Sequence, residues 1–493
     1  MSTATVPVPA EAVASADERP DETRGGSSAS SLFVVGLLVG TLAVLPLVPW
    51  YRGMDPTMVL LSVVHIAACS IGATVAVFRR LRPCLLVASV FPYCWLAIPA
   101  VYQISHVQAA WNDPGVTLDV SATMRAQGII ALGQVAIVAA YGLVSLRRSA
   151  PPAAWVVGRT GRIWLAVIAA GMLLCALLLV PFVISAAGGV GALFSSRQGF
   201  NQALADNGYT DNTSPLAALT KLVPGAFATV ATLLALYLVR GRASLPPASR
   251  RVSIALCLVG IGTLCIVANP FAFSRFIFLT CFGPVAMMLM RPQRQRAAVA
   301  WLVGCVFAFL LAYPAADLLR GSESTSGDQI TASLLAGKDY DGFQQAINTV
   351  SYVDEEGISW GSHVVSGLLF FVPRSNWSAK AEPSSITVAQ DRGYSFTNLS
   401  MPIPAEAYLD GGWPGVALLM GALGALFGLL DRAWAAGTRW SLVAAYMTMA
   451  QVGLWRGPFG STMPVFGFAV GLLVLSLVLA ARPSRRIETT TGG

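Results

Sequence analysis

Long apolar runs recur along the chain, and short polar connections separate them. Each run has about 20 residues, which is the length that an α-helix needs to cross a bilayer core of ~30 Å. This spacing predicts an all-α polytopic membrane protein with about twelve transmembrane helices. The predicted helices lie at about 31–50, 58–78, 84–104, 129–146, 163–187, 222–239, 252–269, 275–290, 298–319, 413–430, 440–456 and 461–481.

Arginine marks one side of the predicted membrane bundle. Arginines cluster in every second connection, whereas the same connections and the C-terminal tail hold only Asp431 and Glu488 as acids. Because cytoplasmic loops carry an excess of Lys and Arg, this alternation predicts that those connections and both termini are cytoplasmic. The arginines concerned are Arg79, Arg80, Arg82, Arg147, Arg148, Arg159, Arg162, Arg240, Arg242, Arg250, Arg251, Arg291, Arg294, Arg296, Arg432, Arg439, Arg482, Arg485 and Arg486.

The helices and the charge alternation together predict the organisation of the chain. Residues 1–30 are rich in Pro, Ala, Ser, Glu and Asp, cannot bury a face, and are expected to form a disordered cytoplasmic tail. Residues 31–319 hold the first nine helices, and residues 320–412 form one large extracytoplasmic loop with amphipathic helices. Residues 413–481 hold the last three helices, and residues 482–493 form a second cytoplasmic tail.

Composition excludes two broad classes of protein. Apolar residues make up 55% of the 493 residues, charged residues only 11%, and mean hydropathy is +0.66, which excludes a soluble globular enzyme and a disordered chain. The net charge of +8 belongs largely to the connections that set the orientation, so no nucleic-acid partner is predicted. The eight cysteines all lie in apolar runs, which predicts neither a disulfide framework nor a zinc site in a loop.

The large outer connection carries the candidate chemistry. Residues 328–352 have the apolar spacing of an amphipathic helix, and the apolar stretch 358–372, which contains His363, is too short to span. Farther on, Arg374 and Lys380 stand among prolines and tryptophan, and Glu406 follows shortly before the tenth helix. Arginine binds oxyanions in a bidentate fork, and a nearby carboxylate suits a general base. An interfacial ion-pair network with aromatic anchors fits the same pattern.

Three further arginines depart from the alternation of charge. Arg197 follows the fifth predicted helix, Arg275 opens the eighth, and Arg456 ends the eleventh. A charge at the membrane boundary is costly and indicates a functional site unless the side chain snorkels to the interface. Together with Arg374 and Lys380, these outer cations predict an anionic ligand, for which a lipid-linked phosphate is the natural candidate.

The order of these pieces resembles the O-antigen polymerase (Wzy-type) family of membrane enzymes, which polymerise oligosaccharide repeat units. Ser274-Arg275 and Arg197-Gln-Gly-Phe look similar to family segments, whereas Ser378-Ala379 stand where an acidic or proline-rich pair often follows the tryptophan. The main matching pieces are Lys338-Asp-Tyr-Asp341-Gly-Phe-Gln, Phe371-Val-Pro-Arg374 with Trp377 and Lys380, and Pro404-Ala-Glu406-Ala-Tyr408 running into Gly411-Gly-Trp-Pro-Gly415.

The resemblance implies a glycosyltransferase-C-like enzyme of the cytoplasmic (inner) membrane that makes a surface polysaccharide of the cell envelope. A hydroxyl of one lipid-linked repeat unit would attack the anomeric carbon of a glycan carried on undecaprenyl pyrophosphate. No metal or cofactor is implied, and the implied partners are lipid-linked oligosaccharides, membrane lipids, a chain-length regulator and a flippase. The implied site consists of Glu406 as catalytic base, of Arg374, Arg275, Lys380, Arg456 and Arg197 as pyrophosphate-binding residues, and of Tyr408, Trp377 and His363 as substrate-positioning residues.

Two other classes of function stay open. One is a related membrane glycosyl transfer, either by an O-antigen ligase or by a polyprenyl-phosphate-sugar transferase that uses Asp55, the acid of the first outer connection. Loss of activity on replacement of Asp55, with Glu406 tolerant of replacement, would favour the latter. The other class is a lipid or polysaccharide transporter without chemistry. It predicts polar residues along a path at the membrane midplane, whereas the predicted helix centres are nearly free of charge.

Overall fold

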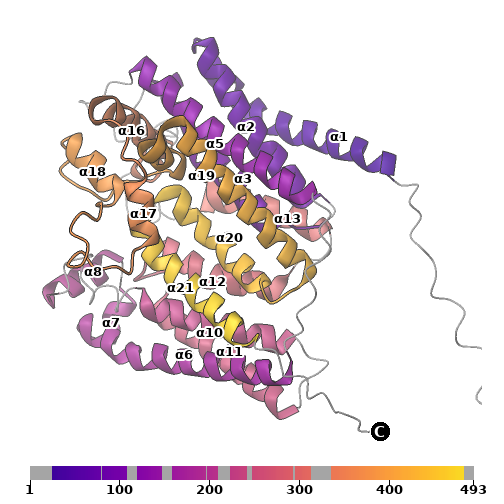
Figure 1. Cartoon of the computed structure of the whole chain (residues 1–493), viewed down its shortest axis with the longest axis vertical. Helices are drawn as coiled ribbons and strands as arrows, with labels where there is room; N and C mark the ends of the chain where they lie inside the picture. The colour runs from indigo at the N-terminus through magenta and orange to yellow at the C-terminus, as the bar shows by residue number, and fades with distance from the viewer. Residues whose placement is uncertain are drawn as a thin grey trace, which may run out of the picture.

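The computed structural model describes residues 25–78, 80–107, 119–146, 158–195, 197–208, 222–240, 247–291, 295–312 and 335–481. Within these ranges the chain is all helical and has no strand (Figure 1). The elements are α1 (Gly25–Val44), η2 (Leu45–Tyr51), α2 (Pro56–Val77), α3 (Pro83–Pro92), η3 (Tyr93–Ala97), α4 (Ile98–Ser105), α5 (Val120–Leu146), α6 (Arg159–Ala186), α7 (Val190–Leu193), α8 (Arg197–Asp206), α10 (Val223–Arg240), α11 (Pro247–Val267), α12 (Arg275–Met290), α13 (Gln295–Phe307), η6 (Ala308–Ala312), η7 (Lys338–Tyr340), α16 (Gly342–Glu356), α17 (Ser362–Leu368), α18 (Ser384–Asp391), α19 (Ile403–Ala436), α20 (Ser441–Arg456) and α21 (Phe459–Leu479).

The long apolar helices make this chain a polytopic membrane protein. Among the described residues, 8 helices are long and apolar enough to cross a membrane by their length and composition. Shorter apolar helices occur at Val35–Tyr51, Arg275–Met290 and Gln295–Leu310. The 8 longer helices are Pro56–Val77, Pro83–Ser105, Val120–Ser145, Thr160–Ala186, Val223–Arg240, Ser249–Val267, Ile403–Ala436 and Phe459–Leu479.

Helices α5 and α19 lie against each other near the centre of the bundle (Figure 1). Their backbones approach so closely that a Cβ atom at Gly424 would lie 2.3 Å from the carbonyl oxygen of Ile137. Small residues permit this kind of close helix packing. In a membrane the hydrophobic effect does not drive helices together, so close van der Waals contact holds them. The α5–α19 contact therefore fixes the position of the segment in which α19 begins.

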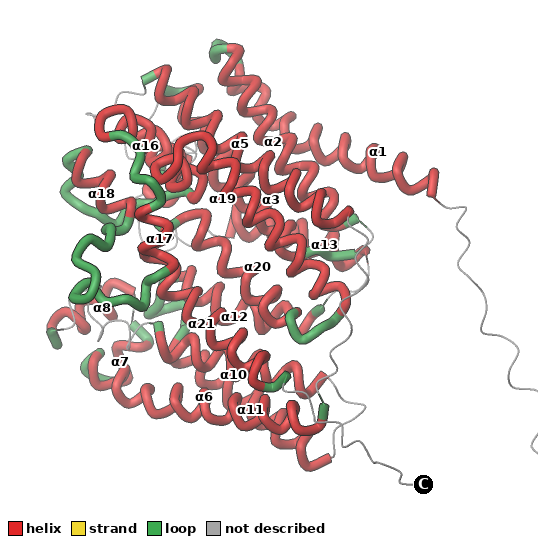
Figure 2. The backbone as a smooth tube through the Cα atoms, viewed as in Figure 1, coloured by secondary structure: helices red, strands yellow, loops and turns green. Residues whose placement is uncertain are grey.

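The bundle has two chemically different ends. Helices α7, α8, α16, α17 and α18 and the longest described loops gather at one end (Figures 1 and 2). At the other end of α19, the Arg291 guanidinium donates to the carbonyl of Trp434 at 3.0 Å, and Arg240 donates to the carbonyl of Leu289 at 2.8 Å. Two arginines from separate predicted cytoplasmic connections thus lie together, away from α16–α18.

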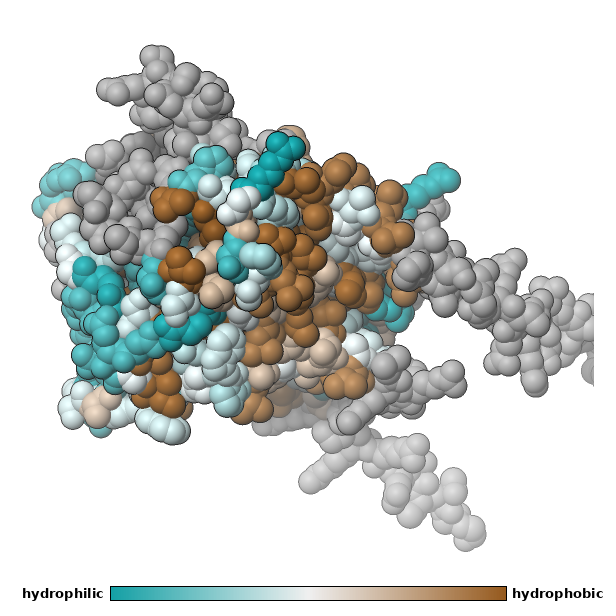
Figure 3. All heavy atoms as spheres, turned by 90° about the horizontal axis from the view of Figure 1, so that it is seen from above, coloured by the Kyte–Doolittle hydropathy of each residue, from teal (hydrophilic) through white to brown (hydrophobic). Residues whose placement is uncertain are grey.

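The surface colouring follows the same division. Apolar side chains cover the middle of the described surface, and hydrophilic side chains gather toward the end that carries α16–α18 (Figure 3). A helix bundle in a bilayer exposes apolar side chains to lipid and polar ones to water, so this arrangement fits a membrane-embedded body with a polar cap. We call residues 335–402 of that end the cap.

The cap differs in detail from the helices that the sequence predicts. The amphipathic helix expected at 328–352 begins only at Gly342, after η7, and residues 328–334 lie outside the described ranges. Of the apolar stretch 358–372, only Ser362–Leu368 is regular helix. Helix α19 begins at Ile403, before the predicted start at 413, and it is kinked at Gly411 and Gly412, where Gly412 has φ 60°. Residue 413 is therefore the start of the second segment of α19.

Candidate active site

Two carboxylates mark the first segment of α19, just before the kink. Glu406 and Asp410 are one helical turn apart and so lie on the same face of the helix. Both are buried, with exposed fractions of 1% and 6%. Pro402 precedes the helix and Pro404 occupies its first turn, where a missing N–H group is harmless. An acid in the first turn also interacts favourably with the helix dipole.

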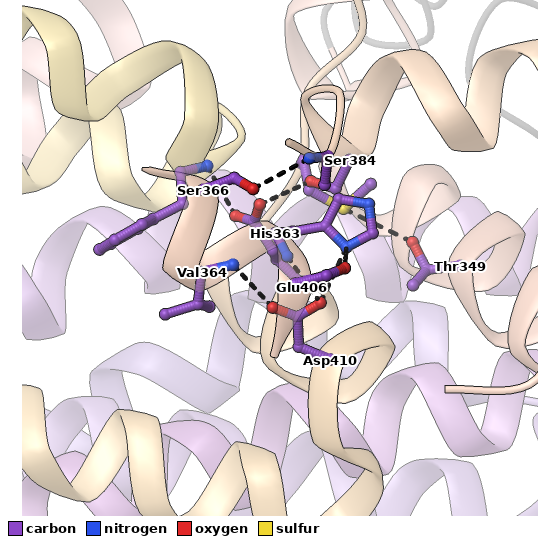
Figure 4. A network of polar contacts seen from close by, with 11 residues as sticks. Thr349, His363, Val364, Ser366, Ser384, Glu406 and Asp410 are labelled. Carbon is purple, nitrogen blue, oxygen red and sulfur yellow. Dashed lines mark hydrogen bonds and ion pairs between the residues drawn. The ribbon is translucent and has the colours of Figure 1, made fainter. Parts of the chain in front are cut away.

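The Glu406 carboxylate joins three helices. The Ser384 hydroxyl, from the first residue of α18, donates to Oε1 at 2.7 Å, and the Phe459 backbone N–H, from the first residue of α21, donates to Oε2 at 2.7 Å. Figure 4 shows the Ser384 contact beside the other polar groups of the site. Both oxygens of Glu406 therefore already accept hydrogen bonds from the protein.

Asp410 holds His363 in a defined orientation. His363 Nδ1 lies 2.8 Å from Asp410 Oδ1, and the backbone N–H groups of His363 and Val364 donate to Asp410 Oδ1 and Oδ2 at 3.3 and 2.7 Å (Figure 4). If Nδ1 carries the proton of this contact, the other ring nitrogen, Nε2, has a lone pair. Among the described residues no hydrogen bond reaches Nε2, so this nitrogen is the reactive position that the geometry leaves for a ligand.

A close helix contact brings α17 and α21 together beside these groups. A Cβ atom at Gly367 would lie 2.6 Å from the ring of Phe459, so only glycine allows α17 to sit there. The same arrangement places the Phe459 N–H against Glu406 and, through α17, His363 against Asp410. The candidate site therefore depends on four helices, α17, α18, α19 and α21.

Lys380 and Arg374 bind backbone carbonyls of their own turn. The Lys380 ammonium donates to the carbonyls of Leu369, Phe370 and Val372 at 3.2, 3.0 and 2.8 Å. Partial burial lowers the pKa of Lys380, and the charge of Arg374 lowers it further. The Arg374 guanidinium donates to the carbonyls of Lys380 and Ala381, at 2.7 and 3.1 Å, and its side chain is exposed. Both cations therefore brace this turn.

The same turn is attached to the candidate site. The Ala381 N–H donates to the Ser366 hydroxyl of α17 at 3.0 Å (Figure 4). Trp377, which is partly exposed, closes the turn through its backbone N–H to Pro373 and Arg374. The structure thus places Arg374, Lys380 and Trp377 on a braced loop that is joined to the helix of His363.

The remaining predicted cations lie on neighbouring elements of the capped end. Arg456, at the end of α20, forms an ion pair with Asp339, and its carbonyl accepts from the Met401 N–H at 2.8 Å. Arg275 is the first residue of α12. Arg197 is the first residue of α8, and its side chain lies outside the described part of the structure. Phe200 of α8 stacks obliquely on Phe273 at 5.1 Å, which brings α8 beside the start of α12.

Tyr408, which is predicted to position substrate, lies in a packed contact between side chains. It is 7% exposed and packs edge-on against Trp413, with 5.7 Å between ring centroids. Since it is two residues after Glu406, it points to another face of α19. Ser384 has no local signal in the sequence that pairs it with Glu406. Asp410, four residues after Glu406, is an alternative base that the sequence itself suggests.

Asp55 and the two aspartates of the Asp339-Tyr-Asp341 segment have structural roles. The Asp55 carboxylate caps α2 by accepting from the Thr57 N–H at 2.7 Å. In the Asp339-Tyr-Asp341 segment, Asp339 pairs with Arg456 and Asp341 accepts from the Ser400 N–H at 2.9 Å. Burial raises the pKa of the Asp341 carboxyl. No group of His, Cys, Asp and Glu within the described ranges has the arrangement of a metal site.

Comparison with known proteins adds no family to this geometry. No protein-family model, no curated protein and no solved structure matches the chain. The likeness to O-antigen polymerases therefore stays a prediction that rests on the sequence pieces quoted above, and the class shown is that of an all-helical polytopic membrane protein.

Proposed function

We propose that this protein is a membrane glycosyltransferase that polymerises lipid-linked oligosaccharide repeat units. The observation that carries the proposal is the Asp410–His363 pair, one helical turn from Glu406, in a buried site where the cap packs on α19. A histidine whose Nδ1 is held by a carboxylate is the arrangement of a general base. The loop that carries Arg374 and Lys380 is hydrogen-bonded to the helix of this histidine, as expected for a site that handles a phosphorylated lipid.

The proposal includes a finer topology. The shorter apolar helices α1–η2, α12, α13–η6 and α20 would complete about twelve spans, and residues 320–412 would form the extracytoplasmic loop of a glycosyltransferase-C-like enzyme. Both termini would then be cytoplasmic. Two features support this topology: the cap and the basic helix ends lie at opposite ends of α19, and the surface between them is apolar.

The proposed reaction follows from the positions of the groups. An acceptor hydroxyl gives its proton to His363 Nε2 as its oxygen attacks the anomeric carbon of the donor glycan. The bond between that carbon and the pyrophosphate oxygen breaks, and its electron pair leaves with the undecaprenyl pyrophosphate. Outer cations such as Arg374 and Arg275 would stabilise the departing charge. This assignment moves the base from Glu406 to His363, because protein donors already occupy both oxygens of Glu406.

A reconstituted assay tests the function. The full chain in lipid nanodiscs is supplied with an undecaprenyl-pyrophosphate-linked repeat unit, and glycan length and released lipid are measured. A ladder of glycans with release of undecaprenyl pyrophosphate is expected. Release of undecaprenyl monophosphate would indicate a polyprenyl-phosphate-sugar transferase. Transfer only after addition of a second lipid acceptor would indicate a ligase. Movement of the substrate across the bilayer without release would indicate a transporter.

The orientation predicts the labelling of single cysteines in intact cells. Ser378 is exposed in the cap, and Ser249 is exposed near the start of α11 at the opposite end. A Ser378→Cys variant is expected to react with an impermeant maleimide, and a Ser249→Cys variant is expected to react only after permeabilisation. The wild-type chain controls for its eight cysteines. Labelling of Ser249→Cys alone would reverse the orientation and remove the site from the outer face.

Arg374 provides a test of phosphate handling. Replacement by alanine removes an exposed guanidinium and is expected to lower polymer formation by roughly 10²-fold or more, as for loss of one donor to developing negative charge. Arg374→Lys should restore little, because an ammonium lacks the planar fork. Arg392→Ala is the matched control, since Arg392 also lies in the cap and pairs with Glu355 at 2.9 Å. Full polymer from Arg374→Ala, at normal protein level, would exclude Arg374 from the site.

A further inference from the structure

The first nine residues of α16, 342–350, are buried on every side. An amphipathic helix in the cap would be expected to turn its polar face to water, yet Gln344, Gln345 and Thr349 are 0% exposed. The chain from Tyr394 to Met401 covers this face: Ser400 donates to Asp341, and Thr349 donates to the Met401 sulfur at 3.5 Å. The polar side of α16 therefore faces an enclosed region of the protein.

The polar groups on this side form a network that is only partly satisfied. Gln344 Nε2 donates to Asn348 Oδ1 at 3.1 Å, and Asn348 Nδ2 donates to Gln345 Oε1 and to the Tyr394 hydroxyl, each at 3.2 Å. Three buried atoms have no hydrogen-bond partner in the described structure: Asp341 Oδ1, Gln344 Oε1 and Gln345 Nε2. We call Asp341, Gln344, Gln345, Asn348 and Tyr394 the amide face.

The unpaired atoms show which ligand chemistry would complete this face. Buried polar groups are nearly always hydrogen-bonded, so a set of unpaired ones on one helix face indicates a missing partner. Gln344 Oε1 and Asp341 Oδ1 are acceptors, and Gln345 Nε2 is a donor. A sugar hydroxyl both donates and accepts, and a ring with several hydroxyls matches such a mixed set. None of the five residues is basic, so the face does not suit a phosphate.

Helix α16, which carries most of the amide face, packs against α18 and α19, the helices of Ser384 and Glu406. Thr349 is one helical turn after Gln345, donates to the Gln345 carbonyl at 2.7 Å, and appears in the same network view as Glu406 and His363 (Figure 4). We propose that the amide face is the subsite for a sugar ring of the lipid-linked saccharide, with Asp341, Gln344 and Gln345 bonding to its hydroxyls. This inference rests on the proposed glycosyl transfer and names the residues that select its saccharide.

Ion pairs join α16 and the residues just before it to neighbouring elements. Asp354 pairs with Arg125 of α5, and hydrogen bonding to Arg125 lowers the pKa of Asp354. Glu355 pairs with Arg392, and Asp339 pairs with Arg456. Ion pairs as exposed as these contribute little to stability.

The first test is Gln345→Leu in the reconstituted assay. The change removes the unpaired donor. It also removes Gln345 Oε1, the acceptor of one Asn348 hydrogen bond, while Asn348 keeps its bonds to Gln344 and Tyr394. We expect the KM for the lipid-linked saccharide to rise roughly five- to tenfold, the effect of one hydrogen bond, with little change in kcat. The Tm should fall only slightly, because Asn348 loses its bond to Gln345, while the cost of the buried, partly unpaired amide is removed. A lower Tm with unchanged KM would overturn the proposal.

Gln134→Leu is the matched control. Gln134 is also 0% exposed, also has one unpaired amide atom, and donates to the Ala88 carbonyl at 3.1 Å, but it lies on α5 against α3. It should leave the KM for the saccharide unchanged. An equal rise of KM in both variants would show a general packing effect and would overturn the assignment of the amide face.

A second test does not depend on turnover. A photoreactive benzoylphenylalanine replaces Tyr394 in the full chain, cells that make the lipid-linked saccharide are irradiated, and hexose-bearing adducts are detected by mass spectrometry. Tyr446, which is 3% exposed on α20, receives the same probe as a control. Saccharide adducts at 394 and not at 446 are expected. Absence at 394, or equal labelling at both, would overturn the subsite. Adducts at 394, together with no glycan formation by the wild-type chain in the reconstituted assay, would leave the subsite standing and refute the polymerase.

Discussion

Replacing His363 by alanine is expected to lower the rate of glycosyl transfer by about 10²–10⁴-fold, the usual effect of losing a general base. The protein should still fold, because the backbone N–H groups of His363 and Val364 keep their hydrogen bonds to Asp410 without the imidazole. Rate and Tm are measured on the same preparation. Full activity of the variant would exclude His363 as the base.

His106→Ala controls for the loss of a histidine at the same end of the bundle. His106 is exposed at the end of α4, stacks on Tyr102 at 4.2 Å, and bonds to the Ser105 hydroxyl at 2.8 Å. Among the described residues no carboxylate contacts His106, so no acid orients its ring as Asp410 orients the ring of His363. Its replacement should leave the rate within a few-fold of wild type.

Asp410→Asn separates orientation of the imidazole from capping of α17. The amide oxygen of asparagine can still accept from one backbone N–H, but its NH₂ group can only donate and so cannot accept a hydrogen bond from His363 Nδ1–H. The favoured tautomer then carries its proton on Nε2, which removes the lone pair needed for catalysis. A loss of rate close to that of His363→Ala is expected, and the pH profile of the residual activity should change. An unaltered rate and pH profile would exclude the Asp410–His363 pair from catalysis.

The second large effect is on stability and concerns Glu406. Alanine at this position leaves the buried Ser384 hydroxyl and Phe459 N–H without an acceptor, which costs about 1–3 kcal/mol for each group. The helices α18, α19 and α21 also lose their shared contact. We therefore expect a free energy of unfolding lower by about 2–6 kcal/mol, measured as a fall in Tm in detergent.

Glu406→Gln is the matched variant that keeps these contacts. Its amide oxygen accepts from the Phe459 N–H, and its NH₂ group donates to the Ser384 hydroxyl, which can accept. The Tm should stay near that of the wild type and the rate should fall only modestly. A loss of about 10²–10⁴-fold with a normal Tm would identify Glu406 as the base and refute the assignment to His363.

The membrane character of the chain was predictable because it depends on local composition. A span needs a continuous apolar run of its own, so residues 58–78 predict α2 (Pro56–Val77) and residues 163–187 predict α6 (Arg159–Ala186) closely. The arginine alternation is also local, and it correctly groups Arg240 with Arg291 at one end of the bundle. The start of α19 was misplaced because Ile403–Asp410 is helix buried under the cap, not an apolar run facing lipid.

Part of the candidate site was likewise visible in the sequence. Glu406 and Asp410 stand four residues apart before a Gly-Gly pair, a spacing that any helix converts into one face. His363 is predicted to position substrate, but the sequence assigns it no partner, since the residue that orients it is 47 positions away. The sequence alone could therefore name candidate groups but could not say which of them meet.

Only the tertiary structure decided what each polar group contacts. Lys380 looked like a ligand-binding cation, yet the fold of residues 369–380 places three carbonyls around its ammonium. The amphipathic spacing of residues 328–352 does not reveal what covers the polar side of α16, and in the structure the chain from Tyr394 to Met401 returns to cover it. The physical reason is that apolar periodicity and charge act on neighbours in sequence, and they determine which segments enter the membrane. Hydrogen-bond partners of buried groups come from distant segments, so the packing of the cap on the bundle selects them.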